Sequence, residues 1–215
     1  MRFRYAIFDM DGTLLDSIPY WDRLVPQFLR ECGAEAGDDV NGRMASLPLQ
    51  ECGAWLKEQF SLAQASGDSV KELYQRIGKY YREEILPRPG VKEWLSELRN
   101  QGVRMCVATA SSAELGRAAM ERNGLMPYLD FLVDCQMAGT GKESPAVYLL
   151  AAEKFGALPQ ECAVVEDSGF ALQTAKEAGF LTVGVYEESE TDQERVRRYS
   201  DWYIKKGEPI NLPAD

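Results

Sequence analysis

Short apolar runs alternate with segments of helical periodicity from residue 86 onward, and this order restricts the fold more than any other feature of the chain. The apolar runs span 103–108, 131–133, 163–165 and 181–185, with a further candidate edge strand at 201–204. The helical segments span 90–100, 112–123, 144–156 and 168–178. Strands that alternate with helices in this way are typical of a parallel sheet. The sequence therefore predicts an α/β fold, with helices and a parallel sheet arranged as a three-layer αβα core.

The segment between residues 16 and 85 breaks this alternation. Its apolar residues fall at helical spacing over three stretches, with no strand pattern between them: 21–32, 52–60 and 70–81. Pro87, Pro89 and Gly90 then forbid further helix and favour a stiff hinge. The sequence thus predicts two domains, a discontinuous core made of residues 1–15 and 86–215 and a small all-helical domain, residues 16–85, inserted into it.

Composition narrows the classes of function. The chain has 215 residues and a formal net charge of −10, which opposes binding to nucleic-acid backbones but leaves room for a small phosphorylated substrate. No apolar run approaches the roughly 18 residues of a membrane span, and Asp9 interrupts the first apolar stretch too early for a secretory signal. We therefore expect a cytoplasmic protein that binds neither nucleic acid nor membrane. The sequence leaves the oligomeric state open.

The chain contains no histidine, and its five cysteines are widely spaced. This excludes Ser-His-Asp and Cys-His nucleophiles, and no Cys-x-x-Cys pair indicates a zinc site. Catalysis must therefore use carboxylates, Lys or a metal ion.

Two aspartates follow the first predicted strand. Asp9 and Asp11 come directly after the apolar run Tyr5–Phe8, and Gly12 follows them. Open α/β proteins bind ligands at the carboxyl edge of the sheet, and adjacent buried carboxylates need a balancing charge such as Mg²⁺. A plain turn is the alternative, because Asp and Gly both favour turns. A calcium loop is excluded, because this segment lacks a third acid before the glycine and has Tyr20 at the position where a calcium loop needs Glu.

Polar residues also follow three later apolar runs or open the next helix. Thr109 is placed to hold a phosphate at a helix N-terminus, Lys142 to neutralise charge on a phosphoryl group, and Glu166 with Asp167 to complete a cation site. Each residue also has a plain structural explanation: Thr109 or Asp167 as a helix N-cap, and Lys142 as a solvated loop residue. Their joint placement at one sheet edge favours phosphoryl chemistry.

The order Asp9-Met10-Asp11-Gly12-Thr13, Thr109, Lys142, Glu166-Asp167 resembles the four motifs of the haloacid dehalogenase-like hydrolase superfamily. The resemblance extends over essentially the whole chain. The helical segment after the first motif resembles the cap of the subgroup that includes β-phosphoglucomutase and many small phosphatases. The resemblance implies a Rossmann-like core with an inserted helical cap.

The resemblance also implies a role for the catalytic residues. Asp9 is the expected nucleophile, which forms an aspartyl-phosphate, and Asp11 is the expected general acid and base. Thr109 and Lys142 are expected to hold the phosphoryl oxygens, with Ala110 and Gly12 also at the substrate. Gly12 and Thr13 are expected to start the turn that leads to the cap.

The same resemblance implies Mg²⁺ as the cofactor. Its expected ligands are the Asp9 carboxylate, the Asp11 backbone carbonyl and Asp167, with Glu166 bound to the ion directly or placed behind the ligands. Within the superfamily, dehalogenases do not need an acid two residues after the nucleophile, because halide leaves without a proton. Asp11 therefore favours a phosphate ester as substrate.

The sequence departs from relatives at two points. The third motif reads Lys142-Glu143-Ser144-Pro145 where relatives often have Lys-Pro-x-Pro, and the cap histidine of β-phosphoglucomutase is absent. We therefore expect a Mg²⁺-dependent phosphatase that hydrolyses a small phosphorylated metabolite, a sugar phosphate among the candidates. A β-phosphoglucomutase-like sugar phosphomutase and a non-catalytic protein that binds a phosphorylated metabolite are the alternatives.

Substrate recognition is expected in the helical segment. Trp21 and Arg43 are the candidate substrate contacts there. Trp21 lies on the apolar face of its predicted helix, so packing inside the segment is the competing explanation, and Arg43 has the alternative of an ordinary surface residue.

Overall fold

The computed structural model describes residues 3–35, 37, 40, 43–44, 47, 49–60, 67–206 and 208, with only the backbone described at 49–50 and 67–70. Its centre is a parallel six-stranded sheet in the order β3-β2-β1-β4-β5-β6. The strands are β1 (Tyr5–Phe8), β2 (Arg104–Thr109), β3 (Phe131–Asp134), β4 (Cys162–Glu166), β5 (Leu181–Val185) and β6 (Trp202–Ile204). The predicted α/β fold is confirmed, including the edge strand near residue 202.

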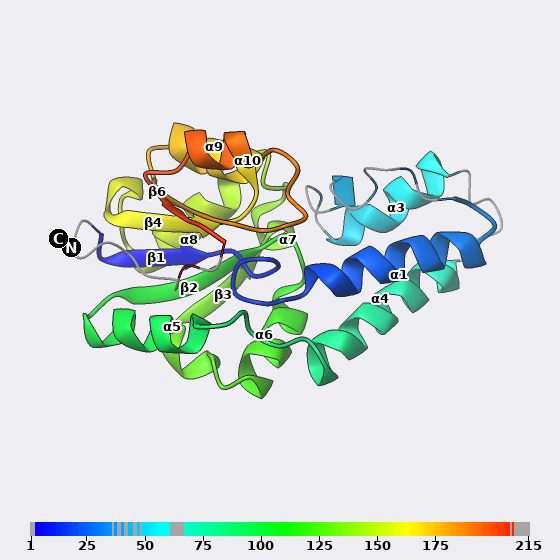
Figure 1. Cartoon of the computed structure of the whole chain (residues 1–215), viewed down its shortest axis with the longest axis horizontal. Coiled ribbons are helices and arrows are strands. Elements are labelled where there is room, and N and C mark those ends of the chain that lie inside the picture. Colours follow the sequence, from blue (N-terminus) through cyan, green and yellow to red (C-terminus); the bar gives the residue numbers. More distant parts are fainter. Residues whose placement is uncertain are drawn as a thin grey trace.

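Helices cover both faces of this sheet, which makes three layers (Figure 1). They are α5 (Val91–Asn100), α6 (Ala113–Arg122), α7 (Cys135–Ala138), α8 (Ala146–Phe155), α9 (Gly169–Glu177) and α10 (Gln193–Arg198), with 3₁₀ turns at Met126–Tyr128 and Pro159–Glu161. Successive residues of β1 serve opposite layers: Phe8 packs edge-on against Trp94 of α5, whereas Tyr5 packs against Phe155 of α8. Because both faces are buried, every residue of β1 is apolar.

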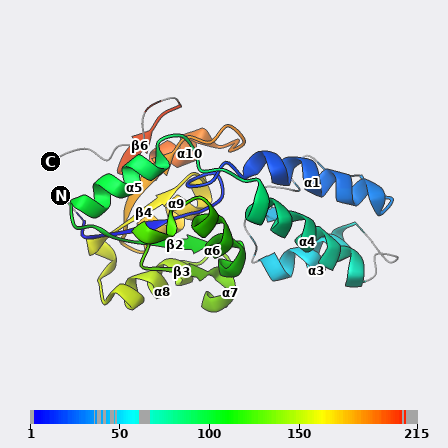
Figure 2. The same cartoon turned by 90° about the horizontal axis from the view of Figure 1, so that it is seen from below.

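The described part of the chain between β1 and α5 is mostly helical. It contains α1 (Ile18–Glu31), α3 (Leu49–Gln59) and α4 (Gly67–Glu83), which lie together beyond the carboxyl ends of the strands (Figures 1 and 2). We call residues 16–85 the helical insert. Helix α4 of the insert packs on helix α6 of the core. The buried side chains of the insert belong to the same apolar cluster as Phe8 and Trp94. The proposed domain boundaries at 15 and 86 stay a prediction.

The two chain segments that enter and leave the insert are bonded to each other. The backbone N–H of Asp16 donates to the carbonyl of Leu86, and that of Arg88 donates to the carbonyl of Leu14, at 2.9 Å each. The Arg88 guanidinium also reaches the carbonyl oxygens of Gly12 and Tyr186. Both connections therefore meet beside the end of β1.

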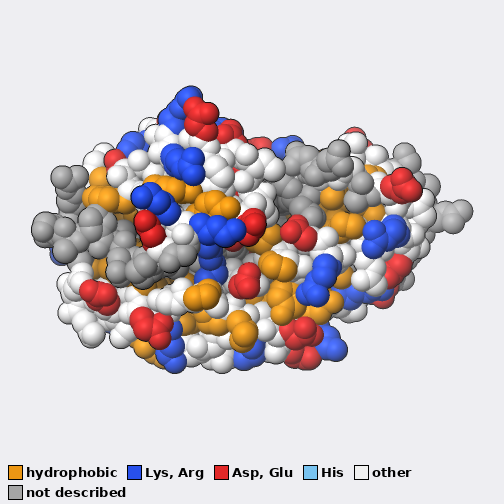
Figure 3. Space-filling view, viewed as in Figure 1, with side chains coloured by type: hydrophobic (Ala, Val, Ile, Leu, Met, Phe, Trp, Pro, Cys, Tyr) orange, Lys and Arg blue, Asp and Glu red, His pale blue; other side chains and the backbone are white. Residues whose placement is uncertain are grey.

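Basic and acidic side chains are interspersed over the described part of the face in Figure 3. This mixture is usual for a protein surface in contact with water. Among the helices that the structure describes, none is long and apolar enough to cross a membrane.

Candidate active site

A cavity of about 880 Å³ lies between the carboxyl ends of the strands and the helical insert. Asp9 and Asp11 reach it from the end of β1, Thr109 from the last position of β2, and Glu166 from the last position of β4. Parallel strands bring these residues together although they are separated by up to 157 positions in the sequence, because all their carboxyl ends share one edge.

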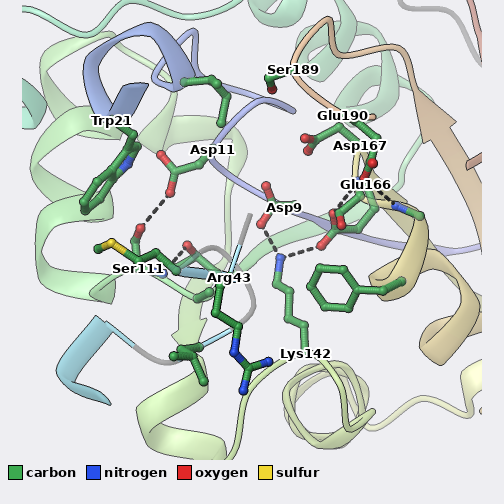
Figure 4. Close-up of a pocket in the computed structure, with 18 of the residues that line it drawn as sticks. Asp9, Asp11, Trp21, Arg43, Ser111, Lys142, Glu166, Asp167, Ser189 and Glu190 are labelled. Carbon is green, nitrogen blue, oxygen red and sulfur yellow. Dashed lines mark hydrogen bonds and ion pairs between the residues drawn. The ribbon is translucent and has the colours of Figure 1, made fainter. Parts of the chain in front are cut away.

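Asp9 lies in an ionic cluster (Figure 4). The ammonium group of Lys142 donates to a carboxylate oxygen of Asp9 and to one of Glu166. All three side chains are buried, with Lys142 only 3% exposed. The Tyr148 hydroxyl of α8 donates to the same Glu166 oxygen at 2.8 Å, and the Ser168 backbone N–H donates to the other at 3.3 Å. Lys142 is therefore a fixed cation between two strand ends and not a solvated loop residue.

Asp167 completes a group of three acids. Ligand oxygens of Asp9, Glu166 and Asp167 all lie within 4.8 Å of one another, a spacing that suits a shared cation. Thr13 donates its hydroxyl proton to Asp167 at 2.6 Å. Gly12 packs against the same carboxylate: its φ is +86°, and a Cβ there would lie 2.6 Å from Asp167 Oδ2. The turn after Asp11 thus fits closely around the third acid.

This cluster contains more acidic than basic groups. Burial raises the pKa of Asp9 to about 8, against the opposing effect of Lys142, and burial together with Asp9 and Glu166 raises the pKa of Asp167 well above its usual range. Burial alone would lower the pKa of Lys142, but Asp9 and Glu166 outweigh it and raise that pKa well above its ordinary value. Lys142 therefore stays charged, and three acids against one ammonium group leave room for a divalent cation.

Asp11 lies in a different environment. Its two carboxylate oxygens accept hydrogen bonds from the Tyr81 hydroxyl and, at 2.7 Å, from the Ser111 hydroxyl. Trp21 Nε1–H donates to the Tyr81 oxygen at 3.3 Å. In Figure 4 the Asp11 carboxylate points toward Trp21 and Ser111, whereas the Asp9 carboxylate points toward Lys142. The two aspartates therefore face different partners in one cavity.

The segment after β2 forms the remaining wall. Thr109 Oγ1 accepts a hydrogen bond from the Ser111 backbone N–H at 3.0 Å, and Ala110 and Ser111 also line the cavity. Ser112 is the N-cap of α6, so Thr109 is not the helix cap that its sequence context allows. Thr109 and the turn that follows it therefore form part of the cavity wall.

The outer rim combines residues of the helical insert and of the core. Arg43 lines the cavity and pairs with Glu143, beside Lys142 in sequence, at 2.9 Å. Residues Ser189–Asp192, from the acidic run after β5, line the opposite side, and Asp192 caps α10 by accepting from the Arg195 N–H. The composition of this run favours a solvated loop, and the structure does place it in the loop before α10, but the same loop also borders the cavity.

The structure places most predicted site residues at the cavity: Asp9, Asp11, Trp21, Arg43, Thr109, Ala110, Lys142, Glu166 and Asp167 line it. Gly12 does not line it and instead packs behind Asp167. Sequence reasoning gave no site role to Tyr81, Ser111 or Tyr148. Tyr81 falls on the apolar stripe of α4, so its hydroxyl gave no signal, whereas Ser111, two residues after Thr109, was visible in the sequence.

The model of the haloacid dehalogenase-like hydrolase family matches residues 3–179. Among curated proteins, hexitol phosphatase A of Escherichia coli is 30% identical over 196 residues, covering 89% of this chain and 87% of that protein. Fructose-1-phosphate phosphatase YqaB of Escherichia coli is 31% identical over 196 residues, covering 86% and 98%.

Among solved structures, β-phosphoglucomutase of Clostridium difficile superposes with a TM-score of 0.79 over 98% of this chain and 94% of that chain, at 16% identity. At this identity the similarity concerns the fold alone. It extends across both the sheet and the helical insert.

Proposed function

Because the chain belongs to the haloacid dehalogenase-like hydrolase family, we propose that it is a phosphatase that hydrolyses a phosphorylated sugar or polyol. The observation that carries this proposal is the buried pairing of Asp9 with Lys142 in the same cavity as Asp11 and Thr109. Two relatives, a hexitol phosphatase and a fructose-1-phosphate phosphatase, support the substrate class.

The proposed reaction has two steps. An Asp9 carboxylate oxygen attacks phosphorus, the bond to the ester oxygen breaks, and Asp11 gives that oxygen a proton. Asp11, now ionised, takes a proton from water as the water oxygen attacks phosphorus and releases Asp9. Lys142 and the Thr109 hydroxyl hold phosphoryl oxygens. The positive charge of Lys142 and the hydrogen bond from Thr109 stabilise the negative charge on the transferring group.

Mg²⁺ is the proposed cofactor, because an excess of buried carboxylates over ammonium groups is the donor set that a hard divalent cation prefers. Asp9 and Asp167 would hold it together with the Asp11 backbone carbonyl. When bound, the ion supplies charge neutralisation for the nucleophile and the phosphate. Glu166 already accepts hydrogen bonds from Lys142, Tyr148 and Ser168. We therefore assign Glu166 the task of positioning Lys142.

Replacement of Asp9 by Asn tests the nucleophile. The variant keeps the shape of the side chain and removes its nucleophilic charge, so we expect phosphate release to fall by at least about a thousandfold while the protein stays folded. The measurement is Mg²⁺-dependent phosphate release from a panel of hexose and hexitol phosphates, with EDTA as the control, together with circular dichroism. Activity retained by a folded Asp9→Asn variant would refute the proposal.

The panel also separates hydrolysis from phosphoryl migration. A phosphatase releases inorganic phosphate from glucose 1-phosphate or leaves it intact, whereas a sugar phosphomutase converts β-glucose 1-phosphate to glucose 6-phosphate. Formation of glucose 6-phosphate without phosphate release would replace the phosphatase assignment with the mutase alternative.

A further inference from the structure

We propose that Tyr81 is a positioning residue for the reaction, whose hydroxyl fixes the carboxylate of Asp11 in the orientation from which it transfers a proton to the leaving oxygen. This inference rests on the proposed function, since it concerns the acid of the same site. It adds a residue of the helical insert to a reaction whose nucleophile, lysine and acids all belong to the core.

The geometry around Asp11 supports this role. Tyr81 holds one carboxylate oxygen and Ser111 holds the other, so the carboxyl plane is fixed at both ends. One donor comes from α4 of the helical insert and the other from the turn after β2 in the core. A single donor would leave the carboxylate free to rotate about the bond to Cβ, whereas two donors from different elements restrict that rotation.

The direction of the Tyr81 hydroxyl is also fixed. Trp21 Nε1–H, a group that can only donate, donates to the Tyr81 oxygen at 3.3 Å, so the tyrosine accepts there. The Tyr81 oxygen also lies 3.3 Å from Ser111 Oγ, but the Ser111 hydroxyl gives its proton to one Asp11 oxygen and the Tyr81 hydroxyl gives its proton to the other. The Tyr81 side chain is completely buried, so water does not compete for this proton. Asp11 itself is partly exposed and lines the cavity in which a substrate would lie.

This placement makes the role of Tyr81 dependent on the leaving group. A sugar alkoxide must receive a proton as its bond to phosphorus breaks, so its departure requires Asp11 in the correct orientation. A nitrophenolate ion leaves without a proton. The value of kcat/KM reports the steps up to release of the leaving group. The loss of orientation should therefore appear in kcat/KM for alkyl esters and not for p-nitrophenyl phosphate.

Tyr81→Phe tests this inference, because it removes only the hydroxyl and keeps the buried ring. The alkyl probe is whichever of fructose 1-phosphate, glucose 6-phosphate and sorbitol 6-phosphate the wild-type enzyme hydrolyses best. We expect kcat/KM for that ester to fall by about tenfold to a hundredfold, the usual effect of a lost hydrogen bond to a charged group. For p-nitrophenyl phosphate we expect a change within about twofold. Equal losses with both esters, or no loss with either, would overturn the role of Tyr81.

Tyr74→Phe is the matched control. Tyr74 lies on the same helix, and its hydroxyl accepts a hydrogen bond from the Gly53 backbone N–H at 2.9 Å, away from Asp11. This variant loses one hydroxyl from the same helix, so we expect it to preserve the ratio of the two kcat/KM values. A ratio that changes as much as in Tyr81→Phe would show a general effect of the helix and overturn the inference.

A double-mutant comparison keeps the inference testable if Tyr81→Phe destabilises the protein. In the Asp11→Asn background, Tyr81→Phe should change the residual rate by less than about twofold, because the acid that Tyr81 positions is already absent. A full additional loss in that background would overturn the inference. Hydrolysis of neither ester by the wild-type protein would instead refute the proposed function itself, so the two failures are distinguishable.

Discussion

Asp9 and Asp11 leave the same strand end two residues apart, yet they lie in opposite kinds of surroundings. Asp9 is held by a buried ammonium ion and lies beside two further acids. Asp11 is held by two neutral hydroxyl groups, one of which belongs to the helical insert. The difference matches what each carboxyl group would do: a nucleophile needs a fixed charge balance, whereas a group that gains and loses a proton is better served by neutral donors.

The comparison also separates the two parts of the chain. Among the described residues, the ionic partners of Asp9 lie on strand ends and loops of the core, and none of them belongs to the helical insert. The neutral surroundings of Asp11 depend on α4 and, through Trp21, on α1. Changes in the core should therefore act on charge and metal binding, and changes in the helical insert on proton transfer.

The largest expected effect follows the removal of the cation beside Asp9. Lys142→Met leaves Asp9 and Glu166 without their shared partner, and the loss of one member of a buried ion pair destabilises by about 3–5 kcal/mol. We expect this loss in chemical denaturation with EDTA, and a larger stabilisation by Mg²⁺ than in wild type, because the metal is then the main balancing charge. Lys154→Met, an exposed residue of α8, is the control. Equal stability of Lys142→Met and wild type would contradict the assigned charge balance.

The second prediction concerns pH. The pKa of Asp9 is raised from 3.8 to about 8, so the folded protein keeps a proton that the unfolded chain releases. Stability contributed by this group is therefore present at low pH and is lost as pH rises toward about 8. In EDTA, we expect the melting temperature of Asp9→Asn to gain about 5 °C or more on wild type between pH 4 and pH 8. A difference that stays constant across this range would contradict the raised pKa.

A third, smaller effect is expected at Gly12, which follows Asp11 and packs against Asp167 beside Asp9. Gly12→Ala places a Cβ against Asp167. The φ of +86° at this position is also strained for any residue that carries a Cβ. We expect a loss of stability of about 1–3 kcal/mol and about tenfold weaker Mg²⁺ binding, measured by calorimetric titration. Gly139→Ala also has a positive φ but has nothing within 4 Å of its added Cβ, so it controls for backbone strain alone. Equal Mg²⁺ affinity in both variants would remove Gly12 from the metal site.

The smallest effect is expected outside both environments. Arg43 is 46% exposed in its side chain and pairs with Glu143 across the cavity rim, and exposed pairs contribute about 1 kcal/mol or less. Arg43→Ala should therefore leave the unfolding free energy within about 1 kcal/mol of wild type. We expect Arg43→Ala to raise KM for sugar phosphates and to leave kcat nearly unchanged. A large loss of kcat would place Arg43 in the reaction and not at the rim.

The surroundings of Asp9, which belong to the core, could be predicted from the sequence better than those of Asp11, which include the helical insert. Apolar runs that end in acids identify strand ends, and a parallel sheet necessarily gathers those ends, so Asp9, Glu166 and Asp167 were predictable as neighbours. Tyr81 was not, because helical periodicity indicates that a tyrosine ring is buried but not what its hydroxyl reaches. The same limit applies to residues 189–192: composition favours a solvated loop, and only the tertiary fold brings that loop to the cavity.

The paired entry and exit of the helical insert have a consequence for how such a chain diversifies. The strand-like bridge between Leu15 and Pro87, with hydrogen bonds on both sides of it, brings the two ends of a seventy-residue excursion together. A replacement of different length or shape could be attached at the same two points without shifting any strand of the sheet. The core would keep its nucleophile and charge balance, while each new insert would bring its own rim and its own contact to the acid.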